Sequence, residues 1–291
     1  MPARGDMRDH SKLAGTVINQ QEATYTHEDT ILYALALGFG ADPVDDKQLR
    51  YVYEENLRAL PTLAMVLAYP GFWMKQPEYG FDWKQVLHAE ETVEIHHPIP
   101  AEGTLAGETV VEEVVDRGAE KGCFVYLRKE LTSIDGKTPI ATVISNTLAR
   151  GDGGFGGTNT PRSRMPGPPE REPDVVCDLP TLPQAALIYR LCGDMNPLHA
   201  SPRIAANAGF ERPILHGRCT MGVAMHALLR SCCDYEAERL QSMQVRFSAP
   251  FLPGDTLRTE IWREGEITFF RSSSLERGVT VLSNGSARIA N

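Results

Sequence analysis

The chain has 291 residues and a formal net charge of −9. This length suggests about two domains with room for real hydrophobic cores. The negative charge disfavours nonspecific binding to nucleic acid, and no run approaches the ~18 apolar residues of a membrane span. Residues 1–12 are polar and lack the apolar stretch of a signal peptide. We therefore expect a globular protein with no nucleic-acid partner and no membrane span.

The chain contains six cysteines without the spacing of a zinc site. Reduced, buried thiols in a reducing compartment are the simplest interpretation, and we expect no metal. The six are Cys123, Cys177, Cys192, Cys219, Cys232 and Cys233.

The first half predicts a helix over about 54–69, followed by a series of β-strands. Residues 109–115, 123–131 and 139–148 are rich in β-branched and aromatic side chains and are separated by turn signals. These segments predict an antiparallel sheet that follows the helix.

A linker is expected between the halves, at residues 151–178. Glycines dominate residues 153–157 and prolines dominate residues 166–169. Such residues mark loops and stiffen the path of the chain. No Gly-Lys-Ser/Thr follows the glycines, so a surface crossover fits better than a phosphate-binding loop.

The second half repeats the pattern of helix and sheet. Ser201, Pro202 and Gly209 mark the ends of a short helix, and apolar spacing predicts a longer helix over about 217–233. The strands predicted after it cover residues 243–247, 256–262, 267–274 and 279–284.

A weak internal repeat relates the two halves. The pattern Pro-x5-Thr-Leu-x2-Glu begins at Pro98 and again at Pro250, and Ser-Asn-x2-Ala-Arg begins at Ser145 and again at Ser283. Two unrelated α+β domains would not share this spacing. We predict two repeats, residues 1–150 and 179–291, joined by the linker.

The segment from Tyr189 to His199 carries the chemistry. Asp194, Asn196 and His199 lie within six residues, and Pro197 interrupts them. Proline removes a backbone donor and restricts its predecessor, so we expect a rigid turn rather than one regular helix. A carboxylate and an imidazole that share one water make an acid–base pair. The alternative for a lone Asp-x-Asn-Pro is an Asx-turn that caps a helix, beside an ordinary buried histidine.

The start of the second-half helix offers a partner for that pair. Gly217 would let a ligand approach the backbone closely. The unpaired amides of the first turn could then stabilise an oxyanion.

These strings together resemble a known family. Tyr-Arg-Leu-Cys-Gly-Asp-Met-Asn-Pro-Leu-His, followed by Pro-Ile-Leu-His-Gly-Arg-Cys-Thr, is similar to the hydratase 2 motif of MaoC-like, (R)-specific 2-enoyl-CoA hydratases. In the first half, the segments that begin at Tyr51, Leu60, Asp116 and Gly153 resemble the hydratase 2 part of peroxisomal multifunctional enzyme type 2.

The resemblance implies an α+β double hot-dog fold. It also implies a hydro-lyase of fatty acid β-oxidation that hydrates trans-2-enoyl-CoA to (R)-3-hydroxyacyl-CoA. The CoA thioester is the substrate, and no separate cofactor is expected. In this scheme Asp194 and His199 polarise one water, Asn196 orients it, and an amide near Gly217 stabilises the enolate.

Only the second half has this motif, because residues 38–45 have a turn but no histidine. The resemblance therefore implies one active site per chain and a degenerate first repeat that accommodates the acyl tail. Candidate residues for lining that space are Leu60, Leu63, Met65, Val66, Phe72 and Trp73.

Further roles are also implied by resemblance. Glu54 matches a glutamate linked to activity, which we interpret as structural support. Candidate contacts with CoA are His88, Ala89, Arg117, Arg246 and Phe247. Ala89 and Arg117 depart from the family pattern, which has glycine and lysine at these positions.

Three alternatives stay open. A dehydratase of short branched or dicarboxylic acyl-CoA would use the same residues. A hot-dog thioesterase would add water at the carbonyl instead. A noncatalytic acyl-CoA-binding module would not require the acid–base pair. We also expect a homodimer and a bacterial cytoplasmic location, since the final residues are not a Ser-Lys-Leu address.

Overall fold

A computed structural model describes residues 9–156, 162 and 166–290 of the chain. Gly157 of the predicted linker and the terminal Asn291 lie outside these residues. Within the described residues, ten strands form one antiparallel sheet in the order β1-β3-β4-β5-β2-β7-β10-β9-β8-β6. The first repeat supplies β1 (Val17–Tyr25), β2 (Val86–Ile95), β3 (Gly103–Asp116), β4 (Cys123–Ser133) and β5 (Pro139–Ala149). The second supplies β6 (Val175–Pro180), β7 (Leu240–Phe247), β8 (Thr256–Glu264), β9 (Ile267–Ser274) and β10 (Val279–Ile289).

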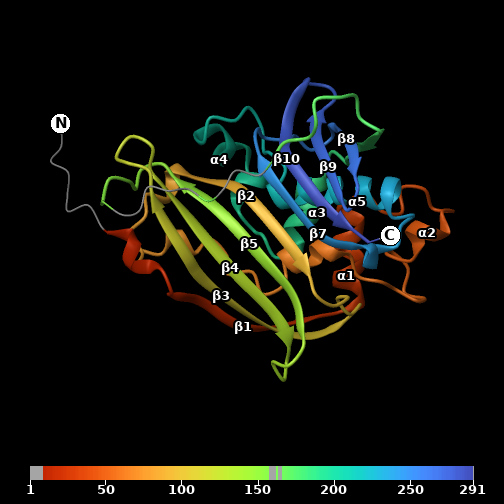
Figure 1. Ribbon diagram of the computed structural model, residues 1–291, viewed down its shortest axis with the longest axis horizontal. Helices are drawn as coiled ribbons and strands as arrows, with labels where there is room; N and C mark the ends of the chain where they lie inside the picture. Colours follow the sequence, from red (N-terminus) through yellow and green to blue (C-terminus); the bar gives the residue numbers. More distant parts are fainter. Residues whose placement is uncertain (1–8, 157–161, 163–165, 291) are drawn as a thin grey trace.

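The two repeats are joined through their sheets. Strand β2 pairs with β7, with Glu90 opposite Arg246 and Glu94 opposite Ser242. Figure 1 shows the strands of the first repeat on the left and those of the second on the right, with β2 and β7 between them. Pairing at this seam removes two sheet edges that would otherwise be exposed.

Helix α5 (Gly217–Cys232) confirms the long helix predicted for the second half. Its apolar residues are almost completely buried, and it packs against β6, β7 and β8. The shorter helix α4 (Pro202–Asn207) also follows the prediction, because the Ser201 side chain caps it and Gly209 follows it with a φ of 85°.

The helix predicted over 54–69 is wrong. Only a 3-10 helix, η2 (Pro61–Met65), forms there, among turns. Pro61 lacks a backbone N–H, and Leu60 before it is extended with ψ 142°, so a continuous helix could not pass through this point.

A buried lysine satisfies the carbonyls left free by the missing helix. Lys129 Nζ of β4 donates to the carbonyl oxygens of Ala64, Met65 and Leu67 at 2.8, 3.2 and 2.6 Å. Only 4% of this residue is exposed. The pKa of Lys129 lies well below its usual value, first because of burial and then because of the nearby Arg218. The Lys129 side chain therefore holds η2 and the residues after it against strand β4.

Several elements were not predicted. Besides β1 and β2, these are helix α1 (His27–Ala36), the four-residue helix α2 (Asp46–Leu49) and helix α3 (Ala185–Tyr189). Strand β6 begins at Val175, inside the predicted linker, and pairs with β8. The strands predicted from 109 to 148 and from 243 to 284 are all present, with most of them longer than predicted. Among the described residues, no helix is long and apolar enough to cross a membrane.

Candidate active site

The chain turns sharply where the Tyr189–His199 segment was predicted to do so. After α3 and the 3-10 helix η5 (Arg190–Cys192), Gly193 adopts a φ of 115°, a conformation that glycine reaches without strain. A second 3-10 helix, η6 (Pro197–His199), follows. The backbone N–H of Asn196 donates to Asp194 Oδ1, and that of Leu198 donates to Asn196 Oδ1. The capping interpretation therefore holds together with the rigid turn.

His199 is held in one tautomer. Its side chain is buried, and Nδ1 lies 2.9 Å from the carbonyl oxygen of Ile214. A carbonyl only accepts, so Nδ1 carries the proton and Nε2 keeps a lone pair. Burial lowers the pKa of His199 and outweighs the opposite effects of Ile214 and Asp194. The ring is therefore a neutral base at pH 7.

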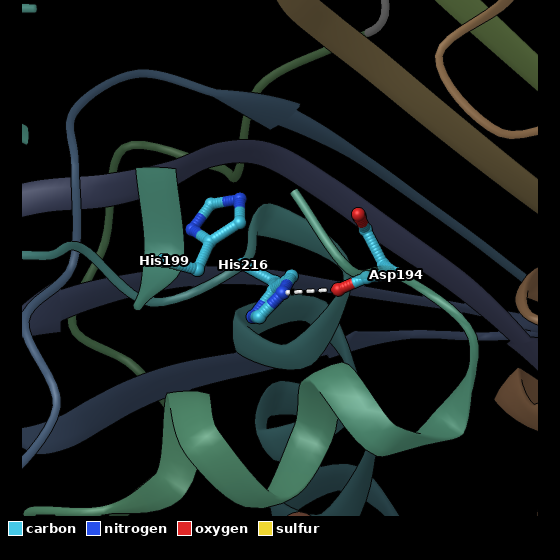
Figure 2. A group of neighbouring side chains, drawn as sticks. All are labelled: Asp194, His199 and His216. Carbon is cyan, nitrogen blue, oxygen red and sulfur yellow. Dashed lines mark hydrogen bonds between the residues drawn. The ribbon is translucent and has the colours of Figure 1, made fainter. Parts of the chain in front are cut away.

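The sequence did not single out His216, which lies beside this pair. Its ring stacks on that of His199, with centroids 3.7 Å apart, and its Nε2 donates to the backbone carbonyl of Asp194 at 3.1 Å. Figure 2 shows the three side chains gathered around this hydrogen bond. Burial and the neighbouring His199 lower the pKa of His216 to about 4. His216 thus fixes the Asp194 backbone while staying uncharged.

The same three residues have the donor types of a metal site. One possible ligand atom from each of Asp194, His199 and His216 lies within 4.8 Å of the other two. The rings of the two histidines are stacked, only 29° from parallel, and one nitrogen of each is already hydrogen-bonded to a backbone carbonyl. This geometry fits an acid–base pair with a stacked support better than a tetrahedral metal centre.

Gly217 opens α5 directly after His216. A Cβ at this position would lie 3.1 Å from Cε1 of Phe247, so glycine permits the close approach of the β7 aromatic ring. The first amides of the helix have no partner within it and carry its positive dipole end. An oxyanion could bind there.

A cavity of about 640 Å³ joins these groups and continues into the first repeat. Asp194, Asn196, His199, Gly217 and Phe247 all line it. Beyond them it follows β4 and β5 in the space that a central helix would fill. We call this part the first-repeat arm; it is lined by Tyr69, Phe72, Trp73, Met74, Val86, Thr109, Leu127, Lys129, Val143, Ser145 and Thr147 of the first repeat and by Arg218 of α5.

The predicted tail-lining residues divide into two groups. Phe72 and Trp73 line the arm. The other four belong to the buried core and not to the cavity wall, which corrects the prediction; they are Leu60, Leu63, Met65 and Val66. Because η2 is short, the segment after it, rather than η2 itself, forms the outer wall.

Only some of the residues predicted to contact CoA line the cavity. His88 and Phe247 line the cavity, with ring centroids 4.5 Å apart. Ala89 lies at a register shift between β2 and β5 and does not line the cavity. Arg117 stacks on Phe124, and the exposed Arg246 lies in β7 opposite Glu90; both are outside the lining.

Two exposed cations that were not predicted, Lys84 and Arg150, line the rim of the cavity. Glu54 is exposed and is not among the lining residues. Its supporting role stays a prediction without a contact in the cavity.

A buried ion pair crosses between the repeats beside the site. Arg218, the second residue of α5, donates from Nε to Glu91 Oε1 at 2.9 Å and from Nη2 to Ser145 Oγ at 3.1 Å. Glu91 Oε2 lies 2.6 Å from His88 Nε2. The register shift in β2 places His88 and Glu91 on the same face despite their odd separation. Although burial opposes ionisation, Arg218 and His88 lower the pKa of Glu91 to about 2.

Comparisons with known proteins identify the family. The model described as MFE-2 hydratase 2 N-terminal domain matches residues 23–151, and the model described as MaoC like domain matches residues 164–285. An enoyl-CoA hydratase of Mycobacterium tuberculosis is 37% identical over 257 residues, which cover 86% of this chain and 88% of that protein. The chain belongs to the MaoC-like hydratase 2 family.

The relatives of this chain differ in length. A probable enoyl-CoA hydratase 2 of Dictyostelium discoideum is 36% identical, with 97% of this chain and 96% of that protein covered. The mouse peroxisomal multifunctional enzyme type 2 is 37% identical over 90% of this chain, which spans only 36% of that enzyme.

Solved structures confirm the fold. A MaoC-like dehydratase from Phytophthora capsici superposes with a TM-score of 0.85 at 32% identity and with 98% of each chain covered. A Mycobacterium tuberculosis protein described as a double hot-dog fold superposes with a TM-score of 0.59 at 15% identity, covering 95% of this chain and 96% of that one. The predicted double hot-dog architecture is therefore correct.

Proposed function

We propose that this chain catalyses the reversible hydration of trans-2-enoyl-CoA to (R)-3-hydroxyacyl-CoA. The observation that carries this proposal is the neutral His199 ring, with its Nε2 lone pair free beside Asp194, in a cavity that also contains the start of α5. Addition of water to an enoyl thioester is catalysed by groups that transfer the proton and by donors that stabilise the enolate, which an acid–base pair and a helix N-terminus can supply. The names of the enoyl-CoA hydratases among the relatives support the same reaction class.

In the proposed mechanism, the Asp194 carboxylate and His199 Nε2 hold one water. As the water oxygen bonds to C3, a proton passes to His199 Nε2 and negative charge develops on the thioester oxygen. The amide at Gly217 stabilises this enolate. The imidazolium then returns a proton to C2 on the same face, which completes the addition of one water and restores the neutral ring.

Asn196 has a more limited role in this scheme than the sequence suggested. Its Oδ1 accepts the Leu198 N–H, so its amide nitrogen is the group left to orient the water or the substrate. The reaction involves no net oxidation or reduction, so we propose that it uses no redox cofactor.

The first-repeat arm would accommodate the acyl group. Sheet residues form its floor, and Phe72, Trp73 and Met74 form its outer wall. A complete central helix would fill this space, as α5 does in the second repeat. The short η2 is therefore the feature that makes room for substrate.

The test is to assay crotonyl-, decenoyl- and mesaconyl-CoA in parallel. Loss of the enoyl absorbance without release of free thiol would support hydration, and free thiol would indicate a thioesterase. Oxidation of the product by an (R)-specific, but not an (S)-specific, 3-hydroxyacyl-CoA dehydrogenase would establish the stereochemistry. No loss of enoyl absorbance with any of the three would contradict the proposal.

A homodimer and a cytoplasmic location also remain proposals. The relatives include both peroxisomal and bacterial enzymes, so the family does not fix the compartment. Light scattering on the purified chain tests the dimer, and localisation of a tagged chain in its own cell tests the compartment.

A further inference from the structure

The inner wall of the first-repeat arm is more polar than a space for a hydrocarbon tail requires. Four hydrogen-bonding side chains line it and are nearly buried. They are Thr109 at 1% exposure, Lys129 at 4%, Ser145 at 7% and the Arg218 side chain at 12%. We call these four residues the polar strip.

The corresponding sheet positions of the second repeat are apolar, although in the first repeat Lys129 also holds η2 through the carbonyls of Ala64, Met65 and Leu67. The internal repeat matches Glu108 of β3 with Glu260 of β8. One residue further along each strand, Thr109 of β3 lies opposite Lys129 of β4. At the matching position of the second repeat, Ile261 of β8 lies opposite Phe270 of β9. Both Ile261 and Phe270 are completely buried. The same sheet position is therefore apolar where α5 covers it and polar where the cavity lies.

The polar strip has unused hydrogen-bonding capacity. Thr109 Oγ1 is buried and has no hydrogen-bond partner among the described residues. The hydrogen bonds found for Arg218 within the described chain use Nε and Nη2, although a guanidinium offers five N–H donors in a fixed fork. A buried polar group without a partner is costly, so a ligand that supplies one would bind favourably.

The charges in this region also favour an electron-rich ligand. Arg218 is a buried cation, the buried Lys129 amine lies near enough to be affected by its charge, and Glu91 is the carboxylate that pairs with Arg218. Repulsion from Arg218 adds to the effect of burial in lowering the pKa of Lys129. An oxygen acceptor in the arm would reduce this repulsion, whereas a methylene chain would not.

We propose that the polar strip binds an oxygen substituent on the acyl group, so that this chain prefers acyl thioesters with a carboxylate or hydroxyl over plain hydrocarbon ones. Arg218 Nη1 and the Thr109 hydroxyl are the donors for that oxygen. This proposal rests on the proposed function, because it places the acyl group in the first-repeat arm.

Saturated six-carbon thioesters test the proposal without relying on turnover. The affinities of hexanoyl-CoA, 6-hydroxyhexanoyl-CoA and the mono-CoA thioester of adipic acid are compared by calorimetry. The corresponding eight-carbon ligands test whether a longer acyl chain is needed for the terminal oxygen to reach the polar strip. Hydrogen bonds to a charged group predict that an oxygenated ligand in one of the sets binds ~10- to 100-fold more tightly than its hydrocarbon analogue. The hydroxyl and carboxylate ligands distinguish the two sources of oxygen. Equal or weaker binding of both oxygenated ligands in both sets would overturn the proposal.

A matched double variant tests the residues. Arg218→Leu with Glu91→Gln removes both charges together, so neither is left buried and unpaired. The ratio of the affinity for the oxygenated ligand to that for its hydrocarbon analogue should then fall toward one. The control is Arg258→Leu with Asp178→Asn, which removes an ion pair outside the cavity and should leave the preference unchanged. Thermal melting checks that both variants fold.

Two outcomes would contradict the assignment. A double variant that keeps the full preference would show that the strip does not select the substituent. An equal loss for all ligands would show that Arg218 contacts the CoA part they share. Activity on trans-2-hexenoyl-CoA is measured separately, so failure of the hydratase proposal remains distinguishable from failure of this one.

Discussion

The imidazole rings of His199 and His216 stack with centroids 3.7 Å apart, and each ring donates one N–H to a backbone carbonyl. The carbonyls belong to Ile214 and Asp194, on either side of the site. This arrangement orients the His199 base and holds the backbone of Asp194.

The catalytic pair is tested by Asp194→Asn and His199→Gln. Each change removes an acid–base group while nearly preserving side-chain volume, so the fold should survive. We expect each to lower the hydration rate at least ~100-fold. The control is His27→Gln, which changes a partly exposed histidine far in sequence from the catalytic pair. A folded variant of the pair with near wild-type turnover would rule out this mechanism.

The support role of His216 is tested by His216→Phe. Phenylalanine can keep the stack but loses the N–H that the Asp194 carbonyl accepts, so the Asp194 loop should be less well positioned. We expect kcat to fall by ~10-fold with a smaller change in KM, and the free energy of unfolding to fall by about 1 kcal/mol. A change in stability alone, with kcat intact, would show that His216 only fills space.

The pH profile of activity reports the base. Burial lowers the pKa of His199, so its neutral form should persist below the ordinary histidine pKa of about 6.5. In kcat/KM, which reports the free enzyme, any loss due to protonation of His199 should therefore begin below that pH. The profile is measured from pH 5 to 8. An inflection due to His199 above pH 6.5 would show that the ring prefers to be charged.

The sequence was most informative where local chemistry sets the structure. Pro197 and the Asx-turn residues determine the turn at Asp194, and apolar spacing determines α5; both were predictable. The short η2 was not, because the apolar run after residue 60 suits a helix and only Pro61 argues against one. The seam between β2 and β7 joins residues about 150 apart, so no local pattern could show it.

The candidate site shows the same limit. Asp194, His199 and Gly217 are close in sequence and were found together. Glu91 and Arg218 contact each other across the two repeats. Glu91 does not stand out, because its segment contains other charged residues, including Glu90 and Glu94. Arg218 lies in a largely apolar stretch, which indicates that a partner must exist but does not identify it.

Lys129 should be essential for closing the first repeat. Lys129→Met keeps the length of the side chain but leaves the carbonyls of Ala64, Met65 and Leu67 without their buried donor. We expect unfolding to become easier by about 3 kcal/mol or more, since each unsatisfied group costs about 1–3 kcal/mol. The exposed Lys137→Met, on the turn between β4 and β5, is the control. Equal denaturant midpoints for the two variants would show that water replaces the ammonium.

Acid should destabilise the protein through its buried histidines before its carboxylates respond. Burial lowers the pKa of His226 to about 4, and His216 reaches a similar value. The unfolded chain, with histidine pKa values of about 6.5, therefore binds more protons than the folded chain between these limits. Stability falls as pH drops through this window, by up to about 1.4 kcal/mol per pH unit for each histidine.

Chemical denaturation from pH 6.5 to 4.5 measures the slope of the unfolding free energy against pH. This range lies above the pKa of Glu91, which is about 2, so Glu91 keeps its charge in the folded protein. His226→Gln should make the slope shallower, although it also loses ring contacts with Phe39. An unchanged slope would show that His226 takes up a proton without unfolding.

The seam between the repeats predicts that neither repeat folds well alone. Strand β2 forms five register pairs with β7, and the Arg218–Glu91 pair crosses the same boundary. A fragment of residues 1–156 would expose the edge of β2 and leave Glu91 buried without its cation. We expect this fragment to be insoluble or to melt without cooperativity, and to be rescued by co-expression with residues 166–291. The matched fragment with Glu91→Gln should be easier to recover, because it removes the unpaired charge while leaving the exposed edge. A soluble wild-type fragment with a sharp thermal transition would show instead that the two repeats are independent domains.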